Sequence, residues 1–152
     1  MLPPLSRVFE ICLYSLLNFF PFLIFALYPF LDDLRFSRTK TGLLIVVLTF
    51  LQILFGLLAC FSTGNISAVL SLISTLSYAF FYFTVIRKSP GQLLFVLLMI
   101  SNIANLVVIT AKCLEGQFFP DFALLPYRYS MSLFMVIVEI FILIPVFIFL
   151  KK

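Results

Sequence analysis

Histidine and tryptophan are absent from this 152-residue sequence, and charged residues make up only 11% of it. Without histidine the chain has no Ser-His or Cys-His nucleophilic pair, no histidine-containing zinc site and no phosphohistidine relay of its own. Its three cysteines, Cys12, Cys60 and Cys113, lack C-x-x-C spacing and cannot all pair, so neither a disulfide framework nor a metal knuckle is indicated. We therefore expect no metal ion and no cofactor.

Several catalytic and nucleic-acid-binding patterns are missing as well. The sequence has no G-x-S-x-G, no H-E-x-x-H and no glycine-rich phosphate loop. Asp32 and Asp33 stand next to Arg35 and Arg38, a pattern typical of a solvated, self-neutralising turn rather than of a catalytic acid pair. The net charge of +4 arises from basic residues scattered in ones and twos. We expect neither an enzyme nor a nucleic-acid-binding protein.

Apolar side chains are present in great excess. Hydrophobic residues make up 64% of the chain and the mean hydropathy is +1.25, whereas soluble domains are about 45–50% apolar. Five apolar runs approach the roughly 20 residues that a helix needs to cross a bilayer. The sequence therefore predicts an all-α, polytopic membrane bundle, a single integral-membrane domain over residues 1–152. The expected transmembrane spans are 8–31, 42–61, 66–86, 92–112 and 131–150.

The first of these runs also has to be distinguished from a secretory signal peptide. It is too long for the apolar core of a signal peptide, Glu10 and Asn18 interrupt it, and no small-x-small cleavage site follows. We interpret it as a retained span.

The distribution of lysine and arginine predicts an orientation. Loops 32–41 and 87–91 and the C-terminus together carry seven basic residues: Arg35, Arg38, Lys40, Arg87, Lys88, Lys151 and Lys152. The opposite side carries only Arg7, Lys112 and Arg128. By the positive-inside rule the N-terminus lies outside and the C-terminus is cytoplasmic. The expected location is the bacterial cytoplasmic membrane, with the lipid bilayer as the first partner.

Each expected span carries a polar side chain at a similar depth, roughly 10–15 Å below the outer surface at 1.5 Å of rise per residue. These residues are Asn18, Gln52, Ser74, Asn102, Asn105 and Glu139. One interpretation is interhelical hydrogen bonding that fixes packing, worth about 0.6 kcal/mol per bond. The other is a ligand or ion site. We favour packing, because Glu139 is the one acidic residue deep in an expected span and has no second carboxylate there with which to couple protons or bind a cation. A hydrogen bond from Glu139 to Asn102 or Asn105 is the contact that this interpretation offers for test.

Loop 113–130 is the longest segment on the outer side and is rich in aromatic residues. Rings of this kind settle at the membrane interface. The segment is interpreted either as an interfacial lid or as an outward pocket for a small peptide or another apolar signal. The candidate contacts for such a signal are Glu115, Phe118, Phe119, Asp121, Phe122 and Arg128.

Three stretches carry a family resemblance: FLDDLRFS at 30–37, residues 93–116 ending in AKCLEG, and PYR at 126–128. They resemble the amino-terminal membrane region of Firmicute sensor histidine kinases with a GHKL-type ATPase, as in peptide-quorum receptors. The resemblance covers nearly the whole chain and implies a sensory input module that signals to a cytoplasmic kinase domain or partner. A second copy of the chain, in a homodimer, is a further candidate partner. The chain reaches Lys152 without a phosphoacceptor histidine or an ATP-binding domain, so the resemblance implies no kinase activity for it.

A receptor-type module is therefore the favoured function. Two alternatives stay open: a structural subunit of a larger membrane complex, and a small carrier or channel that uses the mid-membrane polar residues. Co-purification with a fixed partner favours the first alternative, and flux through proteoliposomes that is lost on Glu139→Gln favours the second.

Overall fold

A computed structural model describes residues 5–62, 64–124 and 127–150, with side chains described as far as Ile148. The described residues form the helices α1 (Leu5–Leu27), α2 (Arg38–Phe61), α3 (Asn65–Val85), α4 (Pro90–Phe118), α5 (Pro120–Ala123) and α6 (Tyr129–Leu150), and the 3-10 turn η1 (Tyr28–Phe30). Five of these segments are long and apolar enough to cross a membrane: α1 continued by η1, α2, α3, α4 and α6. The prediction of a helical chain is confirmed for the described residues, and five segments have the length and apolar composition that crossing a membrane requires.

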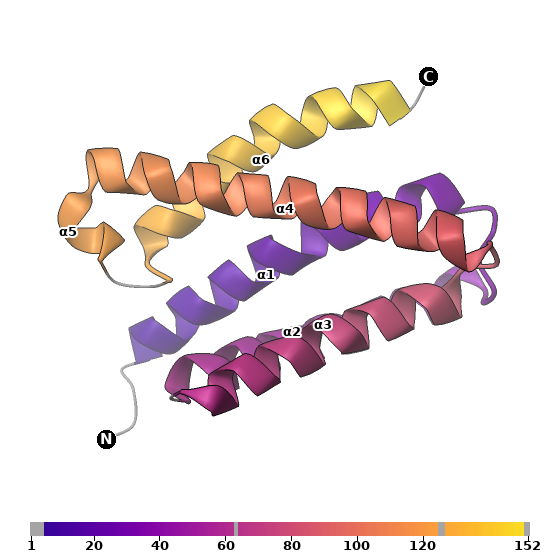
Figure 1. The fold of residues 1–152 in the computed structure, drawn as a ribbon, viewed down its shortest axis with the longest axis horizontal. Helices are drawn as coiled ribbons and strands as arrows, with labels where there is room; N and C mark the ends of the chain where they lie inside the picture. The colour runs from indigo at the N-terminus through magenta and orange to yellow at the C-terminus, as the bar shows by residue number, and fades with distance from the viewer. Residues whose placement is uncertain (1–4, 63, 125–126, 151–152) are drawn as a thin grey trace.

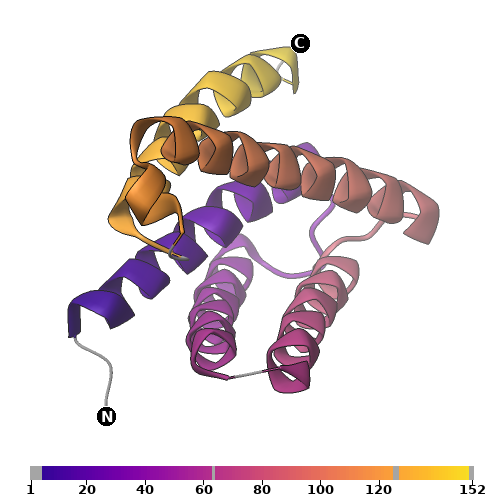
Figure 2. The ribbon, with the colours of Figure 1, turned by 60° about the vertical axis from the view of Figure 1, so that its left-hand side comes forward.

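The five long helices run alternately between two ends of the molecule (Figure 1). We call the end formed by residues 28–40 and 86–89 the basic end, and the opposite end, which carries α5 and the α2–α3 turn, the α5 end. α2 and α3 form an antiparallel hairpin on one side, and α4 pairs with α6 on the other (Figures 1 and 2). α1 lies between the two pairs and contacts α2, α4 and α6.

The core follows the buried face of α1 and the basic-end half of α3. Leu23 and Ala26 on α1 and Tyr82 on α3 are fully buried. The Tyr82 hydroxyl donates a hydrogen bond of 3.0 Å to the carbonyl of Ala26, in the last turn of α1, where the final carbonyls lack partners within the helix. Elsewhere large apolar side chains face outward, such as Phe50 and Phe80, as expected of a surface solvated by lipid tails.

Two connections are joined at the basic end. The backbone amide of Arg35 donates to Val85 O at 2.8 Å, and that of Arg87 donates to Asp33 O at 2.8 Å. Lys88 Nζ lies 3.0 Å from Asp33 Oδ2. The α1–α2 and α3–α4 connections are therefore held together as one unit. Among the described residues, this end carries Arg35, Arg38, Lys40, Arg87 and Lys88.

Four predicted spans lie within four residues of the helix ends, but α4 continues well beyond its expected end at Lys112. It runs to Phe118, and α5 follows, so loop 113–130 is largely helical. Lys112 ends the apolar run, yet nothing from 113 to 118 interrupts the backbone hydrogen bonds of a helix. The helix stops at Phe119 because the residue before a proline, here Pro120, is disfavoured in the α conformation.

Candidate functional site

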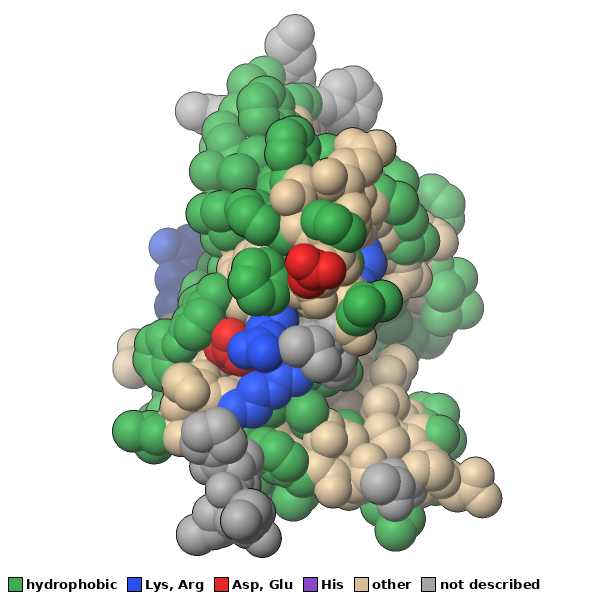
Figure 3. Space-filling view, turned by 90° about the vertical axis from the view of Figure 1, so that its left-hand side faces the viewer, with side chains coloured by type: hydrophobic (Ala, Val, Ile, Leu, Met, Phe, Trp, Pro, Cys, Tyr) green, Lys and Arg blue, Asp and Glu red, His purple; other side chains and the backbone are tan. Residues whose placement is uncertain are grey.

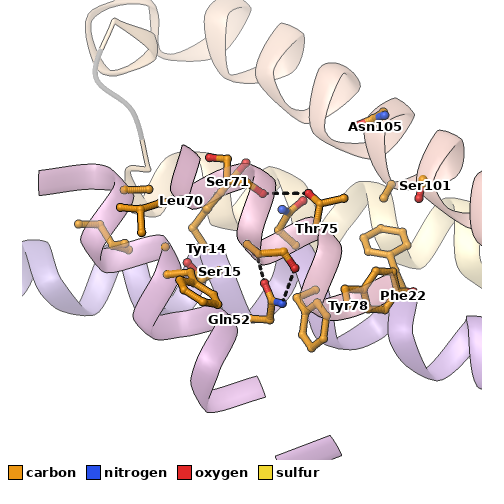
Figure 4. Close-up of a pocket in the computed structure, with 18 of the residues that line it drawn as sticks. Tyr14, Ser15, Phe22, Gln52, Leu70, Ser71, Thr75, Tyr78, Ser101 and Asn105 are labelled. Atoms are coloured by element: carbon orange, nitrogen blue, oxygen red, sulfur yellow. Dashed lines mark hydrogen bonds between the residues drawn. The ribbon is translucent and has the colours of Figure 1, made fainter. Parts of the chain in front are cut away.

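A cavity of about 470 Å³ lies between α1, α2, α3 and α4, and Tyr127 from the α5–α6 connection also lines it (Figure 4). Four of the six residues expected at a common depth line it: Asn18, Gln52, Ser74 and Asn105. The remaining lining is a mixture of hydroxyl and apolar side chains, without Asp, Glu, Lys or Arg among the described residues. The cavity therefore offers hydrogen bonds and apolar contact, but no acid–base group and no counter-charge.

Gln52 joins α2 to α3 on one wall of the cavity. Its side-chain amide donates to Ser74 O at 3.0 Å, and Ser74 Oγ donates back to Gln52 Oε1 (Figure 4). The amide also donates to Ser77 Oγ at 3.1 Å. Gln52 is only 8% exposed. For this pair the packing interpretation describes the contacts well, because each polar group has a partner inside the hairpin.

The other polar groups of α3 and those of α4 are differently placed. Ser101 and Asn105 on α4 and Ser71 and Thr75 on α3 line the cavity, and all four are exposed (Figure 4). The Thr75 hydroxyl donates to Ser71 O within its own helix, at 3.0 Å. These side chains present polar atoms to the cavity rather than to a neighbouring helix.

Asn102 and Glu139 do not join this group. The Asn102 amide donates to Leu98 O in its own helix at 2.9 Å, and the side chain is exposed outside the cavity lining. Glu139 on α6 is 7% exposed, and its Oε1 has no hydrogen-bond partner among the described residues. The expected bond from Glu139 to Asn102 or Asn105 is therefore wrong for this arrangement. Sequence gives the depth of a residue, but not the rotation of its helix about the helix axis.

Glu115 also differs from expectation. It was expected as an outward contact for a signal, but it is fully buried, accepting hydrogen bonds from Lys112 Nζ at 2.7 Å and from Ser130 Oγ. Because α4 continues to Phe118, Glu115 follows Val107 and Ala111 at intervals of four residues on one buried face. Its carboxylate links α4 to the start of α6.

The other expected signal contacts stay near the surface of the α5 end. Phe118 stacks on Phe134 of α6 with a centroid distance of 5.7 Å, and Phe119 lies 6.1 Å from Phe122 and 6.2 Å from Phe134. The side chains of Phe118, Phe119, Phe122 and Asp121 are exposed, and none of them lines the cavity. They combine packing against α6 with an apolar outer surface, which suits a membrane interface.

A buried charge cluster at the α5 end was missed by the sequence reasoning. Glu10 is 4% exposed and receives a 2.9 Å hydrogen bond from Arg7, while Arg128 Nη1 lies 3.6 Å from its other oxygen. Figure 3 shows basic and acidic side chains gathered at the centre of this end, within an apolar surround. The i, i+3 spacing of Arg7 and Glu10 is the signal that points to half of this cluster.

The same cluster holds the connection to α6 against α1. Arg7 also donates to Tyr127 O at 3.4 Å, and the rings of Tyr14 and Tyr127 lie 4.6 Å apart. Partial burial raises the pKa of the Tyr127 phenol, with Cys60 adding to the rise and Arg7 opposing it. The neutral phenol and Tyr14 both line the cavity at this end.

The chain matches no protein-family model, no curated protein and no solved structure.

Proposed function

We propose that this chain is the membrane-embedded receptor module of a bacterial signalling system, in which a small ligand binds in the cavity between α1, α2, α3 and α4. Ligand binding is then passed to a cytoplasmic kinase domain or protein partner. The observation that carries this proposal is the cavity itself, with its volume of about 470 Å³ and its uncharged polar lining.

A purely structural subunit has no need of such a space. Protein interiors are close-packed, and voids larger than a water molecule are few. Ligand pockets have volumes of about 300–1,000 Å³ and combine apolar walls with a few polar groups. The mixture of phenylalanine, serine and asparagine side chains around this cavity fits that description.

The fold also supports a route from the cavity to the basic end. The four helices that form its walls meet there through two connections, and the bonds between Arg35 and Val85 and between Arg87 and Asp33 join those connections. A ligand shifts a conformational equilibrium only if it binds two states differently. A ligand that changes the separation of α3 from α4 acts directly on this joined unit.

The proposed orientation places the basic end in the cytoplasm. The structure describes eight lysine and arginine residues, and five of them lie at that end, as the positive-inside rule requires of a cytoplasmic side. Helix α6 also ends on that side (Figure 1).

Labelling of single cysteines tests this orientation. In a variant whose three cysteines are replaced, a single cysteine at Phe36 or Ser89 should react with an impermeant maleimide only from the cytoplasmic side. A cysteine at Ala123 should react only from outside.

The receptor function is tested with a chimera that carries the cytoplasmic part of a histidine kinase after Lys152. Ser101→Phe places a large side chain in the cavity, whereas Asn102→Phe places the same side chain one residue away, outside the cavity. We expect Ser101→Phe to change autophosphorylation in membranes and Asn102→Phe to leave it unchanged. Equal autophosphorylation in both variants and the parent overturns the proposal. A fixed co-purifying partner then favours a structural subunit.

A further inference from the structure

The walls of the cavity differ in their exposure. On the α1 and α2 side the lining includes Ile11, Phe22 and Gln52, which are 1%, 4% and 8% exposed. On α3 and α4, Ser71, Thr75, Ser101 and Asn105 are exposed, although Ile100 of α4 is only 3% exposed, and on α1 the lining residue Asn18 is exposed as well. Most of the exposed polar lining therefore lies on α3 and α4, where the cavity opens.

The arrangement of the helices accounts for this opening. α3 and α4 leave their shared connection at residues 86–89 in diverging directions, as both ribbon views show (Figures 1 and 2). α3 packs extensively against α2 and only slightly against α4. The separation between α3 and α4 therefore increases from the basic end toward the α5 end.

The opening lies at a depth where lipid tails are the solvent. Asn105 is seven residues from Lys112, about 10 Å along α4, and Thr75 is ten residues from the start of α3, about 15 Å along that helix. Polar groups that face hydrocarbon without a partner are costly, and they mark functional sites when they occur. An asparagine and three hydroxyl side chains border this opening.

The lining also restricts the charge of an occupant. The charged groups at the α5 end, Arg7, Glu10 and Arg128, pair with one another and are outside the lining. An ionised ligand in the cavity has no counter-charge and bears the full cost of leaving water. An uncharged molecule with one hydrogen-bonding group and an apolar chain satisfies both the polar and the apolar parts of the lining.

We propose that the cavity takes an uncharged, membrane-soluble amphipath, of the class of long-chain alcohols, ketones or amides, which enters sideways from the bilayer between α3 and α4. Its polar group bonds to the amide of Asn105 and the hydroxyls of Ser101 and Thr75, and its chain lies along Phe19 and Phe22. This inference rests on the proposed function, because it names the ligand class and access route of the same cavity.

The test uses the full chain in phosphatidylcholine nanodiscs with a photoactivatable hexadecanol that carries a diazirine in its chain. The matched charged probe is the corresponding hexadecyl sulfate. We expect the alcohol to label residues 71–75 and 101–105, and unlabelled hexadecanol to compete for this labelling. Asn105→Leu and Ser101→Phe should each reduce it about tenfold, a loss of about 1.4 kcal/mol in binding free energy. Asn102→Phe should leave it unchanged.

Three outcomes overturn the ligand assignment. The first is equal labelling by the alcohol and the sulfate. The second is labelling that spreads over all lipid-facing positions and is not competed. The third is disulfide cross-linking of two chains through cysteines at 75 and 105, which shows that a second copy covers the opening. If Ser101→Phe alters the chimera but labelling is not competed, the proposed function stands and the ligand class is wrong. If labelling is competed but the chimera is unaffected, the cavity binds the amphipath and the receptor function is wrong.

Discussion

Gly56 of α2 and Ser15 of α1 lie in direct contact at the edge of the cavity. A β-carbon built on Gly56 meets the Oγ of Ser15, and it lies 3.3 Å from the Cβ of Ser15. Gly56 and Cys60 are small residues one helical turn apart on α2, and such pairs let two helices approach closely. The structure identifies α1 as the helix that approaches.

Gly56→Val should therefore destabilise the protein. The added side chain overpacks the contact with Ser15, at a cost of about 1–3 kcal/mol. Gly42→Ala is the matched control in the same helix, since nothing lies within 4 Å of a β-carbon added there. Thermal unfolding in detergent, followed by circular dichroism, should show a lower Tm for Gly56→Val only. An unchanged Tm for Gly56→Val contradicts the close α1–α2 contact.

The hydrogen bonds between Gln52 and Ser74 should appear as coupling in a double-mutant cycle. Ser74→Ala removes the hydroxyl that donates to Gln52 Oε1, Gln52→Leu removes that acceptor, and the double variant removes both; the backbone carbonyl of Ser74, to which the Gln52 amide donates, stays in all variants. We expect the double variant to lose less stability than the sum of the two single variants, with a coupling energy of about 0.6 kcal/mol. Strict additivity in the measured unfolding free energies contradicts the bond.

Glu10→Leu should be among the most damaging single substitutions at the α5 end. It removes the buried carboxylate that Arg7 and Arg128 contact, and breaking a buried ion pair from one side costs about 3–5 kcal/mol. The part-exposed arginines place the expected loss at the low end of that range.

Asp32→Asn provides the control for that measurement at the basic end. Asp32 lies 3.8 Å from Arg38, and their side chains are 97% and 84% exposed. Exposed pairs contribute about 0–1 kcal/mol, so the unfolding free energy should hardly change. Comparable losses for Glu10→Leu and Asp32→Asn contradict the buried cluster.

Glu139→Leu should be tolerated and should raise the Tm. The carboxyl group is buried on α6, and its Oε1 has no hydrogen-bond partner among the described residues, so leucine removes a desolvation cost and leaves no amide of Asn102 or Asn105 unpaired. Glu139→Gln retains a polar group and should lie between the parent and the leucine variant. A Tm that falls on Glu139→Leu identifies a bonded carboxyl group and contradicts this expectation.

Part of the candidate site followed from periodicity and depth. Gln52 and Ser74 were expected at one level, and they bond to each other because α2 and α3 are consecutive and joined by a short turn. Asn18 and Asn105 were expected at the same level and line the same cavity. For Glu139 and Asn102 depth was insufficient, because the face on which each residue lies depends on how its helix packs.

The sequence by itself determined that the chain is helical, with five segments long and apolar enough to cross a membrane, since 64% apolar composition in runs of about 20 residues favours helices, which satisfy their own backbone groups in lipid. It also predicted four of the five spans to within a turn or so of the helix ends. These properties depend on neighbouring residues in the chain.

Only the tertiary structure decided which side chains meet. Helix α4 continues past Lys112, and Glu115 is buried. Arg128 lies beside Glu10 although more than 100 residues separate them in the chain, and α3 makes few contacts with α4. The physical reason is that these outcomes depend on the rotation and inclination of whole helices. Rotation and inclination are set by packing between distant segments, such as Gly56 against Ser15, and not by the local pattern of apolar residues.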